Sequence, residues 1–161
     1  TAIQQHLKSA PNDGAALMML AERQISSGDS QAVASYQTLL QQNPNNFVAL
    51  NNLAYLFLQN GQLDKAQEYA EKAVKQRPDN AAAIDTFAQV LVARKDYAKA
   101  VKQYEAVVND DMRDEEIYLN YVEALFLADK TMLVKRKLSQ REMKTEAGLK
   151  RLAQLKTKYA E

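Results

Sequence analysis

Apolar residues recur through most of this chain at the spacing of amphipathic helices, and the helices come in pairs. In the middle of the chain, Leu50, Leu53 and Phe57 occupy one face of a helix with 3.6 residues per turn. Gly61 then marks a turn, since glycine ends a helix at little steric cost. A second apolar stripe stops at Pro78, which has no N–H to continue a helix. The pattern predicts two antiparallel helices joined by a short turn.

This helix pair repeats with a nearly constant period. Pro11, Pro44 and Pro78 are separated by 33 and 34 residues, and Met112 takes the next expected position. The first helix of each pair opens with a similar triad: Leu17-Leu20-Ala21, Leu50-Leu53-Ala54, Ile84-Phe87-Ala88 and Tyr118-Tyr121-Val122. The second helices share a small residue, at Ala32, Ala66 and Ala100, which lets neighbouring helices approach closely. A period of 34 residues with these features resembles the tetratricopeptide repeat.

The resemblance implies an all-α fold: an α-solenoid of stacked antiparallel hairpins, the tetratricopeptide superhelix, with a C-terminal capping helix. We expect one domain over 1–161, with a truncated helix at 1–9, hairpins at 13–43, 46–77 and 80–109, a degenerate hairpin at 115–142 and a capping helix at 144–160. The expected apolar stripe of the capping helix is Leu149, Leu152, Leu155 and Tyr159. Because the helix at 1–9 has no first helix before it, we expect the chain to be the C-terminal fragment of a longer repeat protein.

The first helix of each hairpin carries the positions that line the inner, concave groove of such an array. In tetratricopeptide proteins these positions bind extended peptides or helices, so the resemblance implies a protein partner. The predicted groove residues are Met18, Glu22, Asn51, Asn52, Tyr55, Gln59, Asp85, Thr86, Gln89, Asn120, Glu123 and Leu127. The Asn51 carboxamide can pair with a backbone N–H and C=O, and tyrosines such as Tyr55 are enriched in binding hot spots. The alternative is that Asn52 or Asn120 only hydrogen-bonds a neighbouring helix.

The charge of these positions favours a neutral to basic partner. Tetratricopeptide domains that bind chaperones hold a peptide's terminal carboxylate with groove lysines, an arginine and asparagines. Here the matching positions supply no cation, and Glu22, Asp85 and Glu123 would repel a carboxylate. We therefore expect a neutral or basic peptide or helix rather than a C-terminal carboxylate.

Charge is distributed unevenly, although the whole chain carries a net charge of only +1. Residues 130–161 contain ten Lys or Arg and three Glu, so this segment carries +7 and the remainder −6. The predicted anionic-surface contacts are Lys135, Arg136, Lys137, Arg141, Lys150 and Arg151. They suit an anionic lipid, a polysaccharide or an acidic protein, but the same pattern is typical of the solvated face of terminal helices. The basic residues are not regularly interleaved with aromatic ones, which argues against nucleic acid.

No combination of residues indicates catalysis, a cofactor or a metal. The sequence has no cysteine and one histidine, His6, which has no evident carboxylate partner. Asp110, Asp111 and Asp114 lack the glycine and the final glutamate of a calcium-binding loop. No glycine-rich phosphate loop is present, and no apolar run approaches the ~20 residues that span a bilayer. We therefore predict a non-enzymatic protein with no cofactor and no inserted membrane segment.

A narrower resemblance rests on the segments LNNLAYL and EYAEKAVKQRPDNAAAIDTFAQVLV, followed by a degenerate hairpin and a short basic end. Their order is similar to the C-terminal part of bacterial tetratricopeptide lipoproteins of the PEP-CTERM/exosortase sorting system, which accompany exopolysaccharide production. The chain departs from them at 85–89, where those proteins have Leu-Gly-Trp after Asp-Thr. This resemblance implies a periplasmic or envelope-associated protein; without it, a cytoplasmic location is expected.

Three functions stay open from the sequence. The first is a scaffold that binds a peptide or helix of a partner protein in the groove. The second is a structural or self-assembly element, with a homodimer formed through exposed terminal helices. The third is a binder of anionic polymers or membrane surfaces through the basic C-terminal helices.

Overall fold

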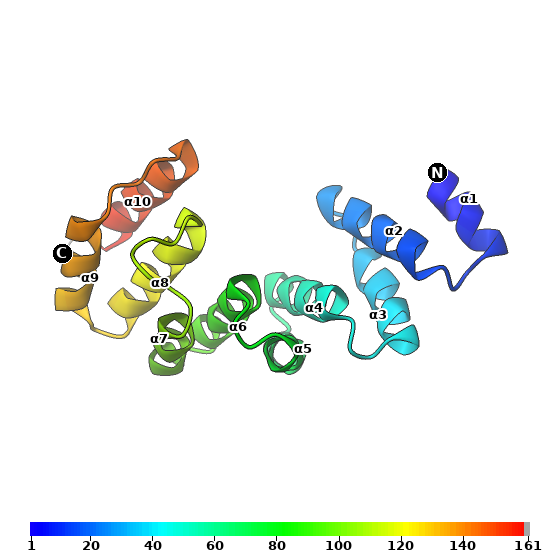
Figure 1. Ribbon diagram of the computed structural model, residues 1–161, viewed down its shortest axis with the longest axis horizontal. Coiled ribbons are helices and arrows are strands. Elements are labelled where there is room, and N and C mark those ends of the chain that lie inside the picture. Colours follow the sequence, from blue (N-terminus) through cyan, green and yellow to red (C-terminus); the bar gives the residue numbers. More distant parts are fainter. Residues whose placement is uncertain (160–161) are drawn as a thin grey trace. The chain divides into compact units, whose positions relative to one another are not determined.

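The structure is a computed structural model that describes residues 1–159, which form ten helices and contain no strand (Figure 1). In chain order the helices are α1 Ala2–Ser9, α2 Gly14–Ser26, α3 Ala32–Gln42, α4 Phe47–Gln59, α5 Leu63–Gln76, α6 Ala81–Ala93, α7 Tyr97–Glu105, α8 Glu115–Leu127, α9 Thr131–Gln140 and α10 Glu146–Lys158. The predicted all-α repeat fold is confirmed. Each predicted hairpin contains two of these helices, from α2 and α3 in the first to α8 and α9 in the fourth. Residue 160 of the predicted capping helix lies outside the described residues.

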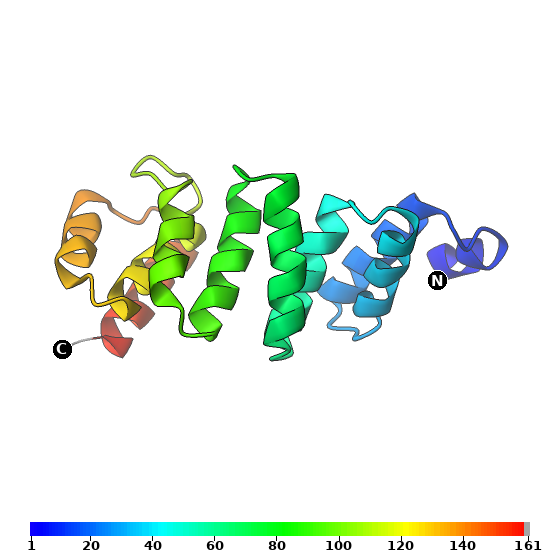
Figure 2. The ribbon, with the colours of Figure 1, turned by 90° about the horizontal axis from the view of Figure 1, so that it is seen from below.

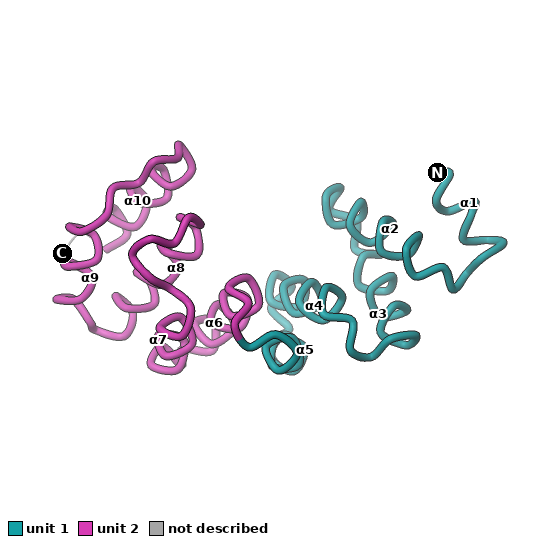
Figure 3. The backbone as a smooth tube through the Cα atoms, viewed as in Figure 1, with its two compact units in different colours: residues 1–78 teal, residues 79–161 magenta. Residues whose placement is uncertain are grey.

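The chain divides into two compact units (Figure 3). Residues 1–78 contain α1 to α5, and residues 79–161 contain α6 to α10. Within each unit, the two helices of a hairpin run in opposite directions and pack against each other (Figure 2). The division falls after Pro78, one of the prolines that mark the repeat.

The start of each first helix is fixed by a side chain two residues after the repeat marker. Asp13, Asn46, Asn80 and Asp114 occupy this position, and an oxygen of each accepts a hydrogen bond of 3.0–3.1 Å from the backbone N–H three residues later. This N-cap satisfies a backbone N–H that has no partner within the helix. The repeat therefore encodes the beginning of each hairpin as well as its apolar face.

The turn inside each hairpin contains one residue in the left-handed conformation. Gly28 and Gly61 adopt φ of 69° there, whereas Lys95 and Asp129 adopt 64° and 58°. In all four turns the next N–H bonds to the carbonyl five residues earlier, at 2.8–2.9 Å. Glycine takes this conformation without steric penalty, but Lys95 and Asp129 strain the backbone.

In the unit of residues 1–78, α2 and α4 lie on one side and α3 and α5 on the other (Figure 1). Leu50, Leu53 and Phe57 of α4 are at most 3 % exposed, as the repeat pattern predicts. Three alanines of α5 are buried opposite them. Because an alanine leaves the backbone accessible to a neighbour, α5 packs closely against α4.

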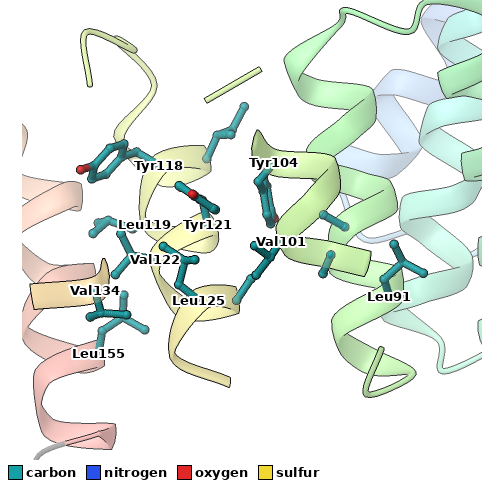
Figure 4. Packing of buried hydrophobic residues seen from close by; sticks show 14 of the residues in the cluster. Leu91, Val101, Tyr104, Tyr118, Leu119, Tyr121, Val122, Leu125, Val134 and Leu155 are labelled. Atoms are coloured by element: carbon teal, nitrogen blue, oxygen red, sulfur yellow. The ribbon is translucent and has the colours of Figure 1, made fainter. Parts of the chain in front are cut away.

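In the unit of residues 79–161, α8 is the central helix and contacts α6, α7, α9 and α10. Figure 4 shows Val101 and Tyr104 of α7 facing Tyr121 and Leu125 of α8. The rings of Tyr104 and Tyr121 have centroids 5.8 Å apart. On the other side, α9 buries only Val134. The second helix of the degenerate hairpin therefore contributes a single buried side chain to this core.

The capping helix α10 is held in place by a contact that the hydrophobic pattern does not reveal. The Glu115 carboxylate accepts hydrogen bonds from the backbone N–H groups of Lys144 at 2.6 Å and Thr145 at 3.0 Å. The Thr145 hydroxyl donates a third bond at 2.5 Å. Together these donors lower the Glu115 pKa, the Thr145 hydroxyl most strongly. Gly148 packs against the same carboxylate, where a Cβ atom would clash with it.

The buried stripe of α10 consequently differs from the prediction. Gly148 and Leu155 are buried and Leu152 is half-buried. The prediction for Leu149 is wrong, because its side chain is 54 % exposed. The helix turns its glycine toward Glu115, and this rotation carries the neighbouring leucine toward solvent.

Candidate functional site

Three of the five large hydrophobic side chains that are exposed in residues 1–159 lie on α2 and α4. Met19 is 57 % exposed, Val48 39 % and Tyr55 41 %. Val48 and Tyr55 are two helical turns apart and therefore share one face of α4. Met19 has the repeat position of Asn52, whose side chain turns to the preceding helix, so Met19 is not counted with them. We call the α2/α4 face the set of first-helix positions Met18, Glu22, Val48, Asn51, Tyr55 and Gln59. All six residues belong to the unit of residues 1–78, and none of them is a cation.

One member of this face, Val48, was not predicted from the sequence. The signal for it was present, because it is an apolar residue that the packing triad of its helix does not use. The predicted members of the face are Met18, Glu22, Asn51, Tyr55 and Gln59, and all of them are exposed or half-buried.

Tyr36 of α3 lies under the α2/α4 face. Its hydroxyl accepts a hydrogen bond of 2.7 Å from Nδ2 of Asn52 in α4. Burial raises the Tyr36 pKa, the Asn52 bond opposes this rise, and the charge of Glu22 in α2 adds to it. The structure thus uses Asn52 to link α3 to α4, which is the alternative considered for this residue.

Asn51 keeps hydrogen-bonding capacity that the chain does not use. Its Oδ1 atom is shielded from solvent and makes no hydrogen bond with any residue between 1 and 159. A shielded oxygen without a donor costs about 1–3 kcal/mol. The side chain as a whole is half-buried, next to the exposed part of α4.

In the other unit, Asp85 is the centre of a polar cluster. Its carboxylate accepts hydrogen bonds from the Tyr104 hydroxyl at 2.7 Å, from Asn120 at 3.1 Å and from Gln89 at 2.6 Å. Burial raises the Asp85 pKa, and the three hydrogen bonds partly offset this rise. Thr86 is buried and donates to a backbone carbonyl one turn earlier. The polar groups of these predicted groove residues are therefore engaged within the chain.

Glu123 contacts the capping helix instead of an open groove. Its carboxylate accepts hydrogen bonds from Arg151, from Lys158 at 2.8 Å and from Tyr159 at 2.9 Å. Burial alone would raise its pKa, but these donors and their charges hold the pKa below its usual value. Because α10 lies over this part of α8, Glu123 helps to fix the capping helix. Leu127, the last residue of α8, is half-buried.

Half of the predicted anionic-surface residues also have partners within the chain. Lys137 forms an ion pair of 2.7 Å with Asp110. Arg141 lies over the Tyr118 ring, with its guanidinium carbon 4.3 Å from the ring centroid, and donates to a backbone carbonyl. Arg151 is bound to Glu123, as described above. The other predicted residues, Lys135, Arg136 and Lys150, are exposed.

His6 has a carboxylate neighbour that the sequence did not reveal. Its Nε2 lies 2.8 Å from Asp13, and both side chains are at least 36 % exposed. Asp13 also caps α2 by accepting a backbone hydrogen bond from Ala16. This hydrogen bond is the main cause that lowers the Asp13 pKa, and the hydrogen bond with His6 lowers it further. The pair is a surface contact between α1 and the start of α2. Between residues 1 and 159 there is no group of three side chains placed to bind a metal ion.

None of the helices within residues 1–159 is both long enough and apolar enough to cross a bilayer.

Comparison with known proteins supports the repeat. A family model described as tetratricopeptide repeat matches residues 35–68. No curated protein matches the sequence. Among solved structures, MamA (41 to the end) from Desulfovibrio magneticus RS-1 is similar with a TM-score of 0.77 and 17% identity. That match covers 86% of this chain and 78% of the MamA chain.

Two further structures are similar over much of the chain. YrrB, described as a TPR protein with an unusual peptide-binding site, has a TM-score of 0.70 and 20% identity, covering 87% of this chain and 71% of its own. The TPR2B domain of yeast Sti1, in a complex with pHsp70, has a TM-score of 0.62 and 21% identity, covering 69% and 94%. Residues 35–68 therefore match a tetratricopeptide repeat, as predicted, and the chain has the fold of solved tetratricopeptide-repeat proteins such as YrrB.

Proposed function

We propose that the α2/α4 face binds a peptide or helix of a partner protein, so that the chain acts as a non-enzymatic interaction scaffold. The observation that carries this proposal is the pair of exposed apolar side chains, Val48 and Tyr55, on one face of α4, with half-buried Asn51 between them. Apolar groups that gather on a surface and are rimmed by polar residues are typical of interaction sites. The likeness to YrrB, whose description names a peptide-binding site, supports a protein partner.

The residues of the face would make different contacts with the partner. Tyr55 and Met18 would supply apolar contact area, since aromatic side chains dominate most interfaces and methionine adapts to varied surfaces. Rotation of the Asn51 carboxamide would bring its unpartnered oxygen to a backbone N–H of the partner. Glu22 is the only charged member of the face. A neutral or basic partner therefore suits the face better than a carboxylate does.

The experiment is an affinity capture from native lysate, followed by measurement of the affinity of the captured protein. The wild type is compared with the pair Asn51→Ala/Tyr55→Ala. A matched control is Glu68→Ala/Lys72→Ala, which removes an exposed ion pair of 2.6 Å on α5 without changing net charge. Because hot-spot residues cost more than about 1 kcal/mol when truncated, we expect the first pair to weaken binding at least about tenfold and the control to leave it unchanged.

The same measurements at low and high salt test the alternatives. If the captured protein dissociates from the wild type and from every variant at high salt only, the basic C-terminal helices are the binding surface. A homodimer that forms with concentration and ignores the Asn51 and Tyr55 substitutions would support self-assembly. Either result would overturn the proposal for the α2/α4 face.

The narrower resemblance to lipoproteins of the exosortase system stays a prediction, together with the envelope location that it implies. The captured partner tests it as well. An envelope protein or a component of polysaccharide export would support it, and a cytosolic partner would contradict it.

A further inference from the structure

A cleft of about 330 Å³ lies between α8, α9 and α10, on a part of the chain that the α2/α4 face does not include. Its apolar floor comes from all three helices and consists of Val122, Phe126, Val134, Leu138 and Leu155. Figure 4 shows Val122, Val134 and Leu155 pointing toward one another. Sites for whole ligands measure about 300–1,000 Å³. A cleft at the lower end of this range suits a few apolar side chains of a partner.

The repeat explains why this cleft exists. The last three second helices begin two residues after the left-handed turn residue, with Leu63 in α5, Tyr97 in α7 and Thr131 in α9. Leu63 and Tyr97 are half-buried, whereas Thr131 is exposed and lines the cleft. The smaller residue leaves unfilled the space that a leucine occupies in the second hairpin and a tyrosine in the third.

Two free cations line the cleft, one from each of its outer helices. Lys135 of α9 and Lys156 of α10 are both exposed, and neither makes an ion pair with any residue in 1–159. The one carboxylate of the cleft, Glu123, is neutralised by Arg151 and Lys158. The surrounding segment, residues 130–161, contains ten Lys or Arg and three Glu. The cleft is therefore apolar inside and positively charged at its edge.

We propose that this cleft binds an acidic amphipathic helix of a partner protein. Apolar residues on one face of that helix would enter the floor between α9 and α10, and carboxylates beside them would meet Lys135 and Lys156. Charge complementarity selects this occupant, because a basic helix would bring like charges to the two lysines. The charge preference is the opposite of that of the α2/α4 face. The chain would then carry two binding surfaces for partners of different charge.

The test uses the full chain and a designed probe. The probe is a fluorescein-labelled peptide of about four helical turns, with leucine along one face and glutamate along the other. A second peptide carries lysine in place of every glutamate, and a third has the composition of the first but no apolar face. Fluorescence polarisation at moderate salt should show binding of the first peptide only.

Two variants of the protein address the cleft directly. Thr131→Tyr places in α9 the residue that opens α7, and because Thr131 is exposed this change fills the cleft without disturbing the core. Lys135→Glu/Lys156→Glu reverses the charge of the edge, and Lys144→Glu/Lys150→Glu is the matched control of equal charge outside the cleft. We expect Thr131→Tyr and the first pair to weaken probe binding by about tenfold or more. The control pair and Asn51→Ala/Tyr55→Ala should bind as the wild type does.

Several results would overturn the proposal. Equal losses in the two charge-reversed pairs would show unspecific attraction to a basic end. Unchanged binding by Thr131→Tyr would show that the probe does not enter the cleft. Light scattering that finds a dimer abolished by Thr131→Tyr would assign the cleft to a second copy. Binding of laurate without binding of the acidic peptide would assign it to an anionic amphiphile. None of these results depends on whether the α2/α4 face binds its own partner.

Discussion

Replacing Tyr104 by phenylalanine tests the polar cluster around Asp85. Tyr104 is 0 % exposed, and its hydroxyl lies 2.7 Å from the Asp85 carboxylate. Asn120 and Gln89 remain as the other donors to this carboxylate. A hydrogen bond to a charged group contributes about 1.5–3 kcal/mol. We expect Tyr104→Phe to lower the free energy of unfolding by about this amount at neutral pH.

The effect of Tyr104→Phe should become smaller in acid. Burial raises the Asp85 pKa above its usual value of 3.8. The folded state therefore binds this proton more tightly than the unfolded state, and Asp85 makes the protein less stable as pH rises through its folded pKa. Without the Tyr104 donor, which stabilises the charged form, that pKa rises further. Below it the carboxyl is neutral, and the lost hydrogen bond is worth only about 0.5–1.5 kcal/mol.

Urea denaturation followed by circular dichroism, at neutral and at acidic pH, measures both quantities. The matched control is Tyr36→Phe in the other unit, where an equally buried hydroxyl bonds to neutral Asn52 at 2.7 Å. We expect this control to cost about 0.5–1.5 kcal/mol, with no change between the two pH values. Equal costs for the two substitutions at neutral pH, or a Tyr104→Phe cost that does not depend on pH, would refute the reasoning.

Three further predictions concern the turns, the capping helix and a helix cap. Lys95→Gly should raise the Tm by about 1–3 °C. The substitution removes the cost of a left-handed backbone at a non-glycine residue, about 1–2 kcal/mol. The larger conformational entropy of glycine in the unfolded state offsets only part of this stabilisation. Gly61→Ala should lower the Tm in the same thermal scans, and a rise would contradict the turn geometry. Gly148→Ala should speed hydrogen exchange in α10, since the added methyl meets the Glu115 carboxylate. In a Glu115→Ala background, which already lacks this carboxylate, the same substitution should add little. Asn46→Ala should lower the free energy of unfolding by about 0.5–2 kcal/mol in urea, because α4 loses its N-cap, and an unchanged midpoint would exclude that role.

The sequence predicts the hairpins well because the same pattern of residues recurs in each repeat. Each repeat supplies an apolar triad, a small residue opposite it and a turn residue, so an ambiguous position such as Lys95 is settled by its phase with Gly61. The stripe of α10 has no such repetition. Its register is decided by the fit of Gly148 against Glu115, and a glycine contributes nothing to a hydrophobic pattern. The pattern therefore places Leu149 inside, and the structure places it outside.

The candidate site is less predictable, because neighbouring positions on a first helix differ by a small rotation. Asn51 and Asn52 are equivalent by composition, yet only Asn52 reaches the Tyr36 hydroxyl and becomes an internal link. Asp85 likewise turns to Tyr104 of the following helix. For Glu123, the partners come from α10, about 30 residues later in the chain, and no local pattern shows where that helix packs. Contacts of this kind require the tertiary structure.

Hydrogen exchange of the chain alone and in complex with its captured partner tests the central claim most directly. We expect slower exchange in α2 and α4 on binding, over residues 14–26 and 47–59, with α5 unchanged. The same protection should be lost in Asn51→Ala/Tyr55→Ala and kept in Glu68→Ala/Lys72→Ala. Protection confined to α9 and α10, or protection that survives the Asn51 and Tyr55 substitutions, would contradict the assignment of the α2/α4 face as the protein-binding surface.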